Sequence, residues 1–175
     1  KTIAMPQTPL PPTLHDALVQ VLGPSGVPTN PADTEASCVD WRALYHGHCA
    51  AVLRPANTEE CAKAVALCHA HKVPMVPQGG NTSMVGGATP DSSGHAVVIS
   101  TTRMTQIHNI DPADLTMTVD AGVTLKAAQA AASAQGLLLP LSTSSEGSAD
   151  IGGLLATNAG GTLPLIPISA PTRPY

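Results

Sequence analysis

Two glycine-rich segments carry the residue types best suited to binding a phosphate-containing ligand. The first, residues 77–87, follows a short apolar run and contains the pairs Gly79-Gly80 and Gly86-Gly87. Paired glycines let a chain turn sharply after a strand and point consecutive backbone amides at one anion. No lysine follows Gly86-Gly87 and no Gly-x-Gly-x-x-Gly spacing occurs, so both common nucleotide-binding motifs are absent. An alternative interpretation is that these glycines only form a tight turn.

The second segment, residues 146–161, repeats this chemistry with paired glycines, small hydroxyl side chains and one amide side chain. Two such loops, each following a short apolar run, can line one elongated cleft. A ligand with a central pyrophosphate and flat rings at both ends would suit that cleft, because backbone amides would bind the phosphates and small side chains would allow close approach to a ring.

Other residues capable of chemistry do not assemble into a site. His46 and His48 precede a predicted strand, but no second Cys/His pair completes a tetrahedral zinc set. His69 and His71 stand two apart on a predicted helix and therefore face different sides. The serine cluster at 142–145 lacks a Gly-x-Ser-x-Gly elbow. We therefore expect neither a metal centre nor hydrolase chemistry.

Composition restricts the partners. Lys plus Arg is 8 and Asp plus Glu is 12, which gives a formal net charge of −4, and 11% of the residues are charged. This balance excludes a polybasic nucleic-acid binder. Hydrophobic residues make up 43% of the chain, but no run approaches the ~20 apolar residues of a membrane-spanning helix. We therefore expect a small-molecule ligand, no nucleic acid and no membrane span.

The helices and strands that position the two loops can be predicted from the spacing of apolar residues and from the residues that begin and end each element. Apolar spacing and a Gly-Pro stop predict a helix over 13–22, followed by a loop to Trp41. Further on, strands over 50–53, 73–76 and 96–99 alternate with a helix over 58–72, in which Asn57 and Glu60 resemble a capping box. Short connections of this kind imply parallel strands joined by a right-handed crossover, so this part is predicted to be a small parallel βαβ subdomain.

The pattern then changes. Runs over 106–110 and 116–119 flank the turn-forming tetrapeptide 111–114, which favours an antiparallel hairpin. Thr124 and Gly136 delimit a second helix over 125–135. A mixed, antiparallel α+β subdomain is therefore expected to follow the parallel one, and the fold class is α+β.

Cysteine usage bears on the compartment. Cys38, Cys49, Cys61 and Cys68 form no C-x-x-C pair, and Cys61 and Cys68 stand seven apart on a predicted helix, too far apart to bridge. We therefore predict reduced thiols and a cytoplasmic protein.

Seven ordered motifs over about 120 residues resemble the first part of the FAD-binding domain of the vanillyl-alcohol oxidase / p-cresol methylhydroxylase (PCMH) superfamily. Within it they are most similar to the branch of FAD-linked D-lactate, D-2-hydroxyglutarate and glycolate-oxidising enzymes. The motifs are Asp40-Trp41-Arg42, Arg54-Pro55 to Glu59-Glu60, the run from Val76 to Thr82, Val85-Gly86-Gly87, the run from Val119 to Val123, Pro140-Leu141, and Gly147-Ser148 followed by Ile151-Gly152-Gly153 and the run from Ala156 to Gly161.

The resemblance implies that the first loop wraps the FAD pyrophosphate and that the second runs along the ribityl chain and the isoalloxazine. Several relatives carry a flavin-linking histidine where this chain has Asn81, so FAD is expected to bind non-covalently. The residues implied to bind the cofactor are Pro77, Gln78, Gly79, Gly80, Asn81, Thr82, Ser83, Gly86, Gly87, Pro140, Leu141, Gly147, Ser148, Ile151, Gly152, Gly153, Thr157, Asn158, Ala159 and Gly160.

The resemblance also predicts a division of the chain. Residues 1–12 are interpreted as an arm with residual sequence before Met5, 13–161 as the N-terminal part of a PCMH-type FAD-binding domain, and 162–175 as an irregular tail unlike the family. We expect a truncated chain, inactive alone, because the family's metal and catalytic residues lie further along; no catalytic residue is assigned here. The expected parent oxidises a small D-2-hydroxy acid with an unidentified electron acceptor, and a homodimer is a possible assembly. The alternative is a non-catalytic flavin-binding subunit or an inert fragment.

Overall fold

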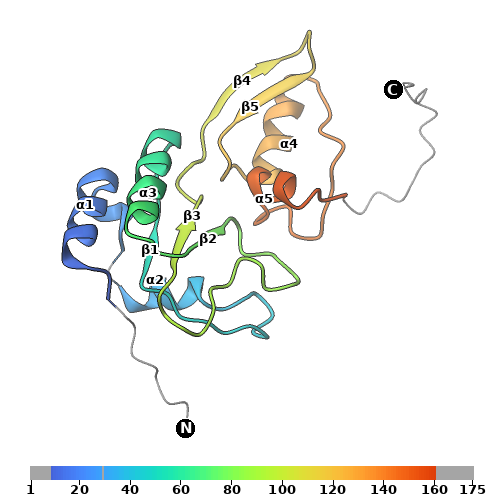
Figure 1. Ribbon diagram of the computed structural model, residues 1–175. Helices are drawn as coiled ribbons and strands as arrows, with labels where there is room; N and C mark the ends of the chain where they lie inside the picture. The colour runs from blue at the N-terminus through green and yellow to red at the C-terminus, as the bar shows by residue number, and fades with distance from the viewer. Residues whose placement is uncertain (1–8, 29, 161–175) are drawn as a thin grey trace, which may run out of the picture.

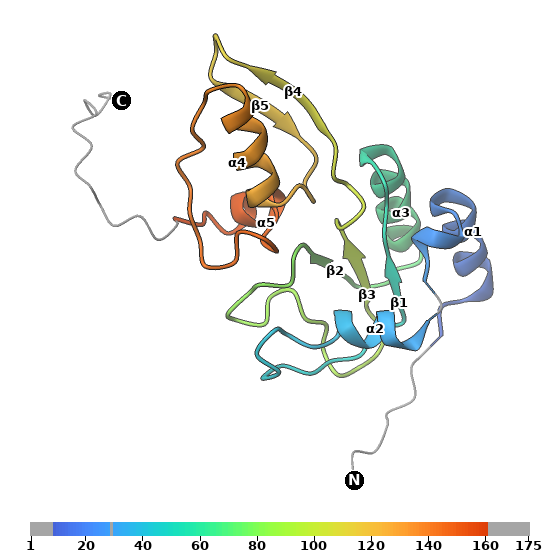
Figure 2. The ribbon, with the colours of Figure 1, turned by 180° about the vertical axis from the view of Figure 1, so that it is seen from behind.

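The computed structural model describes residues 9–28 and 30–160, and these form two lobes joined by the segment 101–106 (Figures 1 and 2). The sheet lobe contains the elements from α1 to β3. The hairpin lobe contains those from β4 to α5. This arrangement confirms the predicted α+β class, with a parallel part followed by an antiparallel part.

The sheet lobe is built on three parallel strands, β1 (Ala51–Leu53), β2 (Met75–Gln78) and β3 (Val97–Ser100). Their order is β1-β3-β2, so β3 pairs with both of the other strands. The predicted parallel arrangement is confirmed, and β3 lies between the two strands that the connecting helix joins. All four residues of β3 are buried, as expected for a central strand.

Two helices cover the sheet lobe. Helix α1 (Pro12–Leu22) buries Leu14 and Leu18 against α3 (Thr58–Ala70) and the sheet. Helix α3 begins at the predicted cap, because Asn57 Oδ1 accepts a hydrogen bond from the Glu60 amide at 2.9 Å. The Glu60 carboxylate in turn accepts from the Ala56 amide at 2.7 Å, one residue earlier than the usual capping box places it.

The predicted loop up to Trp41 is wrong in part, since it contains a 3₁₀ turn (Pro24–Gly26) and the helix α2 (Pro31–Ser37). Asn30 caps α2 by accepting a hydrogen bond from the Ala32 amide at 3.0 Å. Proline at the first helical position after an Asn cap favours a helix start. The helix was missed because seven residues are too few to show periodicity.

The hairpin lobe follows the prediction closely. Strands β4 (Ile107–Asp111) and β5 (Thr116–Val119) pair antiparallel, and Asp111 Oδ1 accepts hydrogen bonds from the amides of Ala113 and Asp114 in the turn. Helix α4 (Leu125–Ala134) lies beside the hairpin (Figure 1). It starts at Thr124, whose hydroxyl accepts from the Ala127 amide at 3.2 Å, and Gly136 follows its end with a φ of 71°.

The second glycine-rich segment is not entirely a loop, because it contains the short helix α5 (Ile151–Ala156). Asp150 caps this helix by accepting a hydrogen bond from the Gly153 amide at 3.0 Å. The loop prediction failed because Gly152 and Gly153 have low helix propensity, and the cap and packing outweigh it here. Residues 1–8 and the tail predicted over 162–175 lie outside the described residues.

Candidate functional site

The structure brings the two glycine-rich segments into direct contact at the boundary between the lobes. A Cβ atom on Gly80 would stand 1.6 Å from the carbonyl oxygen of Ser148, and one on Gly79 would stand 2.2 Å from Asp150 Oδ1. Both distances are far below van der Waals contact, so no side chain fits at either position. These glycines therefore serve inter-loop packing as well as the turn after β2.

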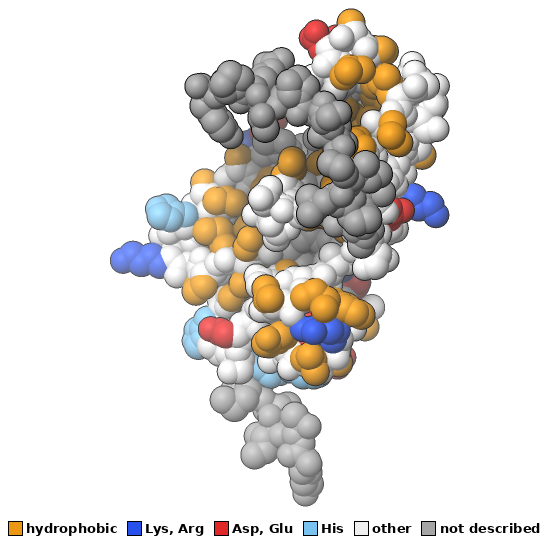
Figure 3. Space-filling view, turned by 90° about the vertical axis from the view of Figure 1, so that its right-hand side faces the viewer, with side chains coloured by type: hydrophobic (Ala, Val, Ile, Leu, Met, Phe, Trp, Pro, Cys, Tyr) orange, Lys and Arg blue, Asp and Glu red, His pale blue; other side chains and the backbone are white. Residues whose placement is uncertain are grey.

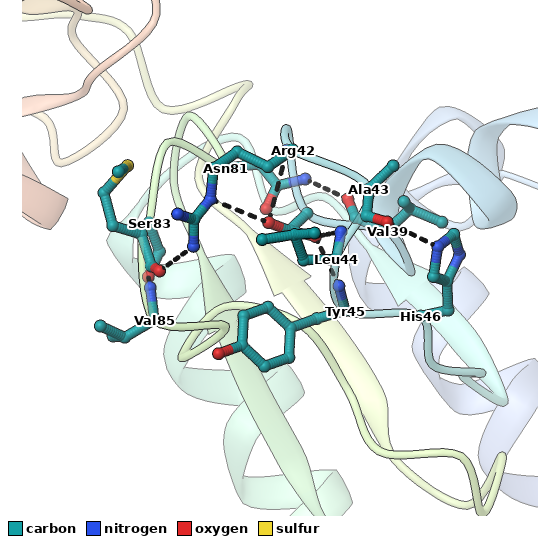
Figure 4. Close-up of polar contacts among 11 residues, drawn as sticks. Val39, Arg42, Ala43, Leu44, Tyr45, His46, Asn81, Ser83 and Val85 are labelled. Carbon is teal, nitrogen blue, oxygen red and sulfur yellow. Dashed lines mark hydrogen bonds and ion pairs between the residues drawn. The ribbon is translucent and has the colours of Figure 1, made fainter.

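Two side chains tie the first loop to the last residue of α2 and to the segment that follows it. Gln78 is 5% exposed, and its Nε2 donates hydrogen bonds to the carbonyl oxygens of Ser37 (2.9 Å) and Ala88 (2.8 Å). Asn81 has a φ of 52°, a left-handed conformation that asparagine tolerates better than most residues, and its Nδ2 donates to the Val39 carbonyl at 2.8 Å (Figure 4). The Nδ2 and Nε2 groups thus hold the loop, so its backbone is left to face a ligand.

The backbone of this loop has unused hydrogen-bonding capacity. None of the amides of residues 79–84 donates a hydrogen bond to another described residue. Asn81 Oδ1 is buried and also has no partner in the described part of the chain. Free amides suit an acceptor such as a phosphate, whereas Asn81 Oδ1 suits a ligand hydroxyl or N–H group. The loop therefore offers hydrogen-bond donors that suit the phosphates of a dinucleotide and one acceptor that suits its hydroxyl or N–H groups.

Asp150 organises the contact between the two loops. It is 5% exposed; its Oδ1 caps α5, and its Oδ2 accepts a hydrogen bond from the Thr101 hydroxyl at 2.5 Å. Thr101 follows β3, so this carboxylate connects the sheet lobe to the second glycine-rich segment. Sequence reasoning missed Asp150, although an aspartate directly before Ile151-Gly152-Gly153 is a recognisable helix cap.

The remaining predicted residues of the second segment are placed differently. Gly152 packs closely on Ala121, because a Cβ atom added to Gly152 would stand 2.7 Å from the Cβ of Ala121. The carbonyl of Leu141 accepts a hydrogen bond from Gln129 Nε2 at 2.7 Å. Several others are exposed: Pro140, Gly147, Thr157, Asn158 and Gly160.

A loop spanning residues 40–46 adjoins the first glycine-rich loop. Asp40 Oδ1 accepts hydrogen bonds from the amides of Leu44 and Tyr45, both at 2.7 Å. Hydrogen bonds from backbone amides, above all from that of Tyr45, hold the pKa of Asp40 below its ordinary value. The Arg42 guanidinium donates to the Met84 carbonyl, which joins the two loops (Figure 4). Sequence reasoning had assigned this loop no role in the site.

Large apolar side chains are exposed on both of these loops. Figure 3 shows hydrophobic side chains gathered around basic groups on one face of the molecule. The exposed residues on the two loops are Trp41, Leu44, Tyr45, Met84 and Val85.

The larger cavity lies within the hairpin lobe rather than between the loops. Its volume is about 540 Å³, and its walls come from the hairpin, α4, α5 and the run 137–139. The lining is mainly apolar, and Ile151 is the one predicted site residue among it. Thr143 Oγ1, in the following segment, is buried without a hydrogen-bond partner in the described part of the chain.

Comparison with known proteins identifies the family. Residues 49–166 match the family described as FAD binding domain (FAD_binding_4). This match covers more than half of the chain, and the chain therefore belongs to this family of FAD-binding domains. This match confirms the resemblance to the PCMH superfamily and supports the expectation that the cofactor is FAD.

Curated relatives refine this assignment. The chain is 36% identical over 145 residues to the mitochondrial D-2-hydroxyglutarate dehydrogenase of Bos taurus, covering 83% of this chain and 26% of the relative. It is 38% identical over 133 residues to the D-2-hydroxyglutarate dehydrogenase of Xanthomonas citri pv. viticola, covering 76% of this chain and 28% of the relative. A mitochondrial protein of Schizosaccharomyces pombe named as a D-lactate dehydrogenase is 37% identical over 133 residues, 76% of this chain and 25% of the relative. The chain thus spans about a quarter of the length of these relatives.

Solved structures confirm the predicted PCMH-type fold. An alkyldihydroxyacetonephosphate synthase superposes with a TM-score of 0.79 at 21% identity, over 89% of this chain and 30% of that one. p-Cresol methylhydroxylase superposes with a TM-score of 0.61 at 21% identity, over 71% of this chain and 25% of that one. At these identities the similarity establishes the fold alone.

The predicted cytoplasmic location is wrong. Relatives from Bos taurus, Schizosaccharomyces pombe and Oryza sativa are named as mitochondrial proteins, which contradicts it. The prediction rested on the expectation that the four cysteines are reduced, and none of them forms a disulfide in the structure. Free thiols report a reducing environment and do not distinguish one reducing compartment from another. In the described part of the chain, no helix is both long and apolar enough to cross a bilayer.

Proposed function

We propose that this chain is the FAD-binding portion of a flavin-dependent dehydrogenase that oxidises a D-2-hydroxy acid, such as D-2-hydroxyglutarate or D-lactate. The observation that carries the proposal is the loop of residues 79–84, with its free amides at the meeting point of two glycine-rich segments. The names of the relatives support the substrate class.

The residues present fit the cofactor. The amides of residues 79–84 would bind the pyrophosphate, and Asn81 Oδ1 would accept a hydrogen bond from a hydroxyl or N–H group of the dinucleotide. Glycine at positions 79 and 80 keeps the two loops close together. The predicted residues of the second segment, 147–160, would contact the rest of the cofactor.

FAD, when bound, supplies the two-electron redox chemistry. The residues of this chain would bind and orient it, and none of them is assigned an acid, base or substrate-binding role. Non-covalent attachment is proposed because Asn81 offers no nucleophilic ring nitrogen. The N-terminal-part assignment of residues 13–161, the homodimer and the inactivity of the chain alone belong to the same proposal.

A comparison of two flavins tests the binding mode. FAD and riboflavin share the isoalloxazine, but riboflavin has no pyrophosphate. Titration of the purified chain, followed by flavin fluorescence, should show FAD binding at least ten times more tightly than riboflavin, which corresponds to ~1.4 kcal/mol. Equal affinities would contradict a pyrophosphate role for residues 79–84.

A turnover assay tests the division of labour. The chain with FAD, D-2-hydroxyglutarate or D-lactate and an artificial electron acceptor should show no reduction of the acceptor above the protein-free rate. The bovine relative, assayed in parallel with D-2-hydroxyglutarate, provides the positive control. Turnover by the chain itself would show that its residues include the catalytic set, and the proposal would then be wrong on this point.

A further inference from the structure

Two cysteines that the candidate cofactor site does not use lie in contact beneath it. The Cys38 thiol donates a hydrogen bond to Cys49 Sγ at 3.3 Å. Both side chains are buried, at 4% and 0% exposed, and they pack with Val52 and Val98 in a small core cluster of their own. Cys38 directly follows α2 and Cys49 precedes β1.

The backbone already holds these two positions together. The Gly47 amide donates to the Cys38 carbonyl at 2.8 Å, and an isolated antiparallel bridge pairs Val39 with His46. A disulfide needs the sulfurs at about 2.05 Å, so each sulfur would move by roughly 0.6 Å, which a small χ1 rotation supplies. By contrast, Cys61 and Cys68 lie on one helix, seven residues apart.

We propose that Cys38 and Cys49 are a redox modification site, a dithiol that hydrogen peroxide converts to an intramolecular disulfide. The thiol of Cys49 lowers the pKa of Cys38 by hydrogen bonding to its thiolate, and the same interaction raises the pKa of Cys49. Cys38 is also the more exposed of the two, at 4% against 0%, so we assign it as the sulfur that ionises first. Both thiols are buried, so oxidation requires a local opening of the fold, and hydrogen peroxide, which is close to water in size, needs a smaller opening than a protein oxidant.

The reaction balances with peroxide as the two-electron oxidant. The Cys38 thiolate attacks one peroxide oxygen, the O–O bond breaks, and the departing hydroxide takes a proton to form water. This leaves Cys38 as a sulfenic acid. The Cys49 sulfur then attacks the Cys38 sulfur, the S–O bond breaks, and the second hydroxide takes the Cys49 proton to form another water. The two thiols lose two electrons in total and peroxide gains them.

The position of the pair gives the modification a structural consequence. The carbonyl groups on either side of Cys38, those of Ser37 and Val39, are the acceptors that hold Gln78 and Asn81 of the first glycine-rich loop. Fixing Cys38 to Cys49 would therefore stiffen the segment to which that loop is tied. This consequence does not depend on whether the loop binds FAD.

Intact mass and peptide mapping test the proposal on the purified chain. After treatment with hydrogen peroxide, free thiols are alkylated in denaturant. We expect a product 2 Da lighter than the untreated chain before alkylation, a crosslinked peptide joining residues 38 and 49, and recovery of both thiols with dithiothreitol. Because the crosslink closes a loop between positions eleven apart, Tm should rise by roughly 5 °C or more. Amide exchange in residues 38–49 should slow at least threefold.

Two variants sharpen the test. Cys49→Ala should lose the crosslink and accumulate a 16 Da adduct on Cys38, whereas Cys61→Ala, the matched control on α3, should form the 38–49 crosslink as the native chain does. Peptide mapping of the native chain gives the same answer without any variant. The proposal is overturned if the native chain keeps its mass under conditions that oxidise its thiols in denaturant. It is equally overturned if the product is a sulfinic acid on Cys38, or if the crosslink joins any other pair.

Discussion

Replacing Gly80 with alanine tests whether the two loops must touch for the site to form. Alanine adds only a Cβ, and that atom would stand 1.6 Å from the Ser148 carbonyl oxygen. Relieving the overlap to 3.0 Å, below which real Cβ contacts are essentially unknown, requires the loops to separate by about 1.4 Å. Over-packing of this kind costs about 1–3 kcal/mol, so we expect Tm to fall by roughly 2–12 °C for a chain of this size.

The same separation should impair FAD binding, because the free amides of residues 79–84 would move away from the second segment. We expect Gly80→Ala to weaken FAD binding at least tenfold in a fluorescence titration, a loss of ~1.4 kcal/mol. Gly87→Ala is the matched control for stability, since its Cβ would meet nothing nearer than Ser83 Oγ at 4.0 Å. The reasoning is refuted if Gly80→Ala keeps the Tm of Gly87→Ala and the FAD affinity of the unchanged chain while circular dichroism shows both variants folded.

Three further predictions concern the residues around this contact. Asp150→Ala removes the cap of α5 and the acceptor of the Thr101 hydroxyl, so urea denaturation should show a loss of about 2 kcal/mol; an unchanged free energy of unfolding would contradict this. Hydrogen bonds to the Asp40 carboxylate, above all from the Tyr45 amide, lower the pKa of Asp40 in the folded state. Its contribution to the free energy of unfolding is therefore complete above the unfolded pKa near 3.8 and is lost as the pH falls through the lower folded value. Asp40→Asn should reduce the decrease in the free energy of unfolding over this acidic range. Acid precipitation of the FAD-loaded protein should leave the flavin in the supernatant, because Asn81 forms no covalent link; flavin in the washed pellet with a matching mass increase would show the opposite.

The elements that the sequence predicts well are those with local signals. Asn57 and Thr124 cap the two longer predicted helices, and the tetrapeptide 111–114 forms the hairpin turn, because caps and turns are decided by neighbours within a few residues. The order β1-β3-β2 could not be predicted in the same way, since it depends on pairing between residues far apart in the chain. Helices α2 and α5 were missed because short helices show no usable periodicity.

The features of the candidate site likewise separate into those that local sequence predicts and those that depend on distant contacts. A glycine-rich loop after a strand is a local pattern, and in the structure the amides of residues 79–84 after β2 donate no hydrogen bond to another described residue. That this loop binds FAD stays a prediction. That Gly79 and Gly80 also face Asp150 and Ser148 is a contact between segments about 70 positions apart, and no single-sequence pattern encodes it. The same is true of Gln78, whose side chain is used to hold the loop rather than left free for a ligand.

The candidate site therefore lies on a boundary between two lobes, and that boundary depends on close backbone approach. Besides Gly80, Gly122 lies so close to the sheet lobe that a Cβ there would stand 1.9 Å from the Thr101 carbonyl oxygen. Thr101 also donates to Asp150, so one short segment after β3 contacts the hairpin lobe twice. A ligand that binds the free amides of the first loop and also contacts the second segment must bridge this boundary. Such a ligand stabilises the contact between the lobes by an amount that grows with the ratio of its concentration to its Kd, because it binds only the assembled arrangement.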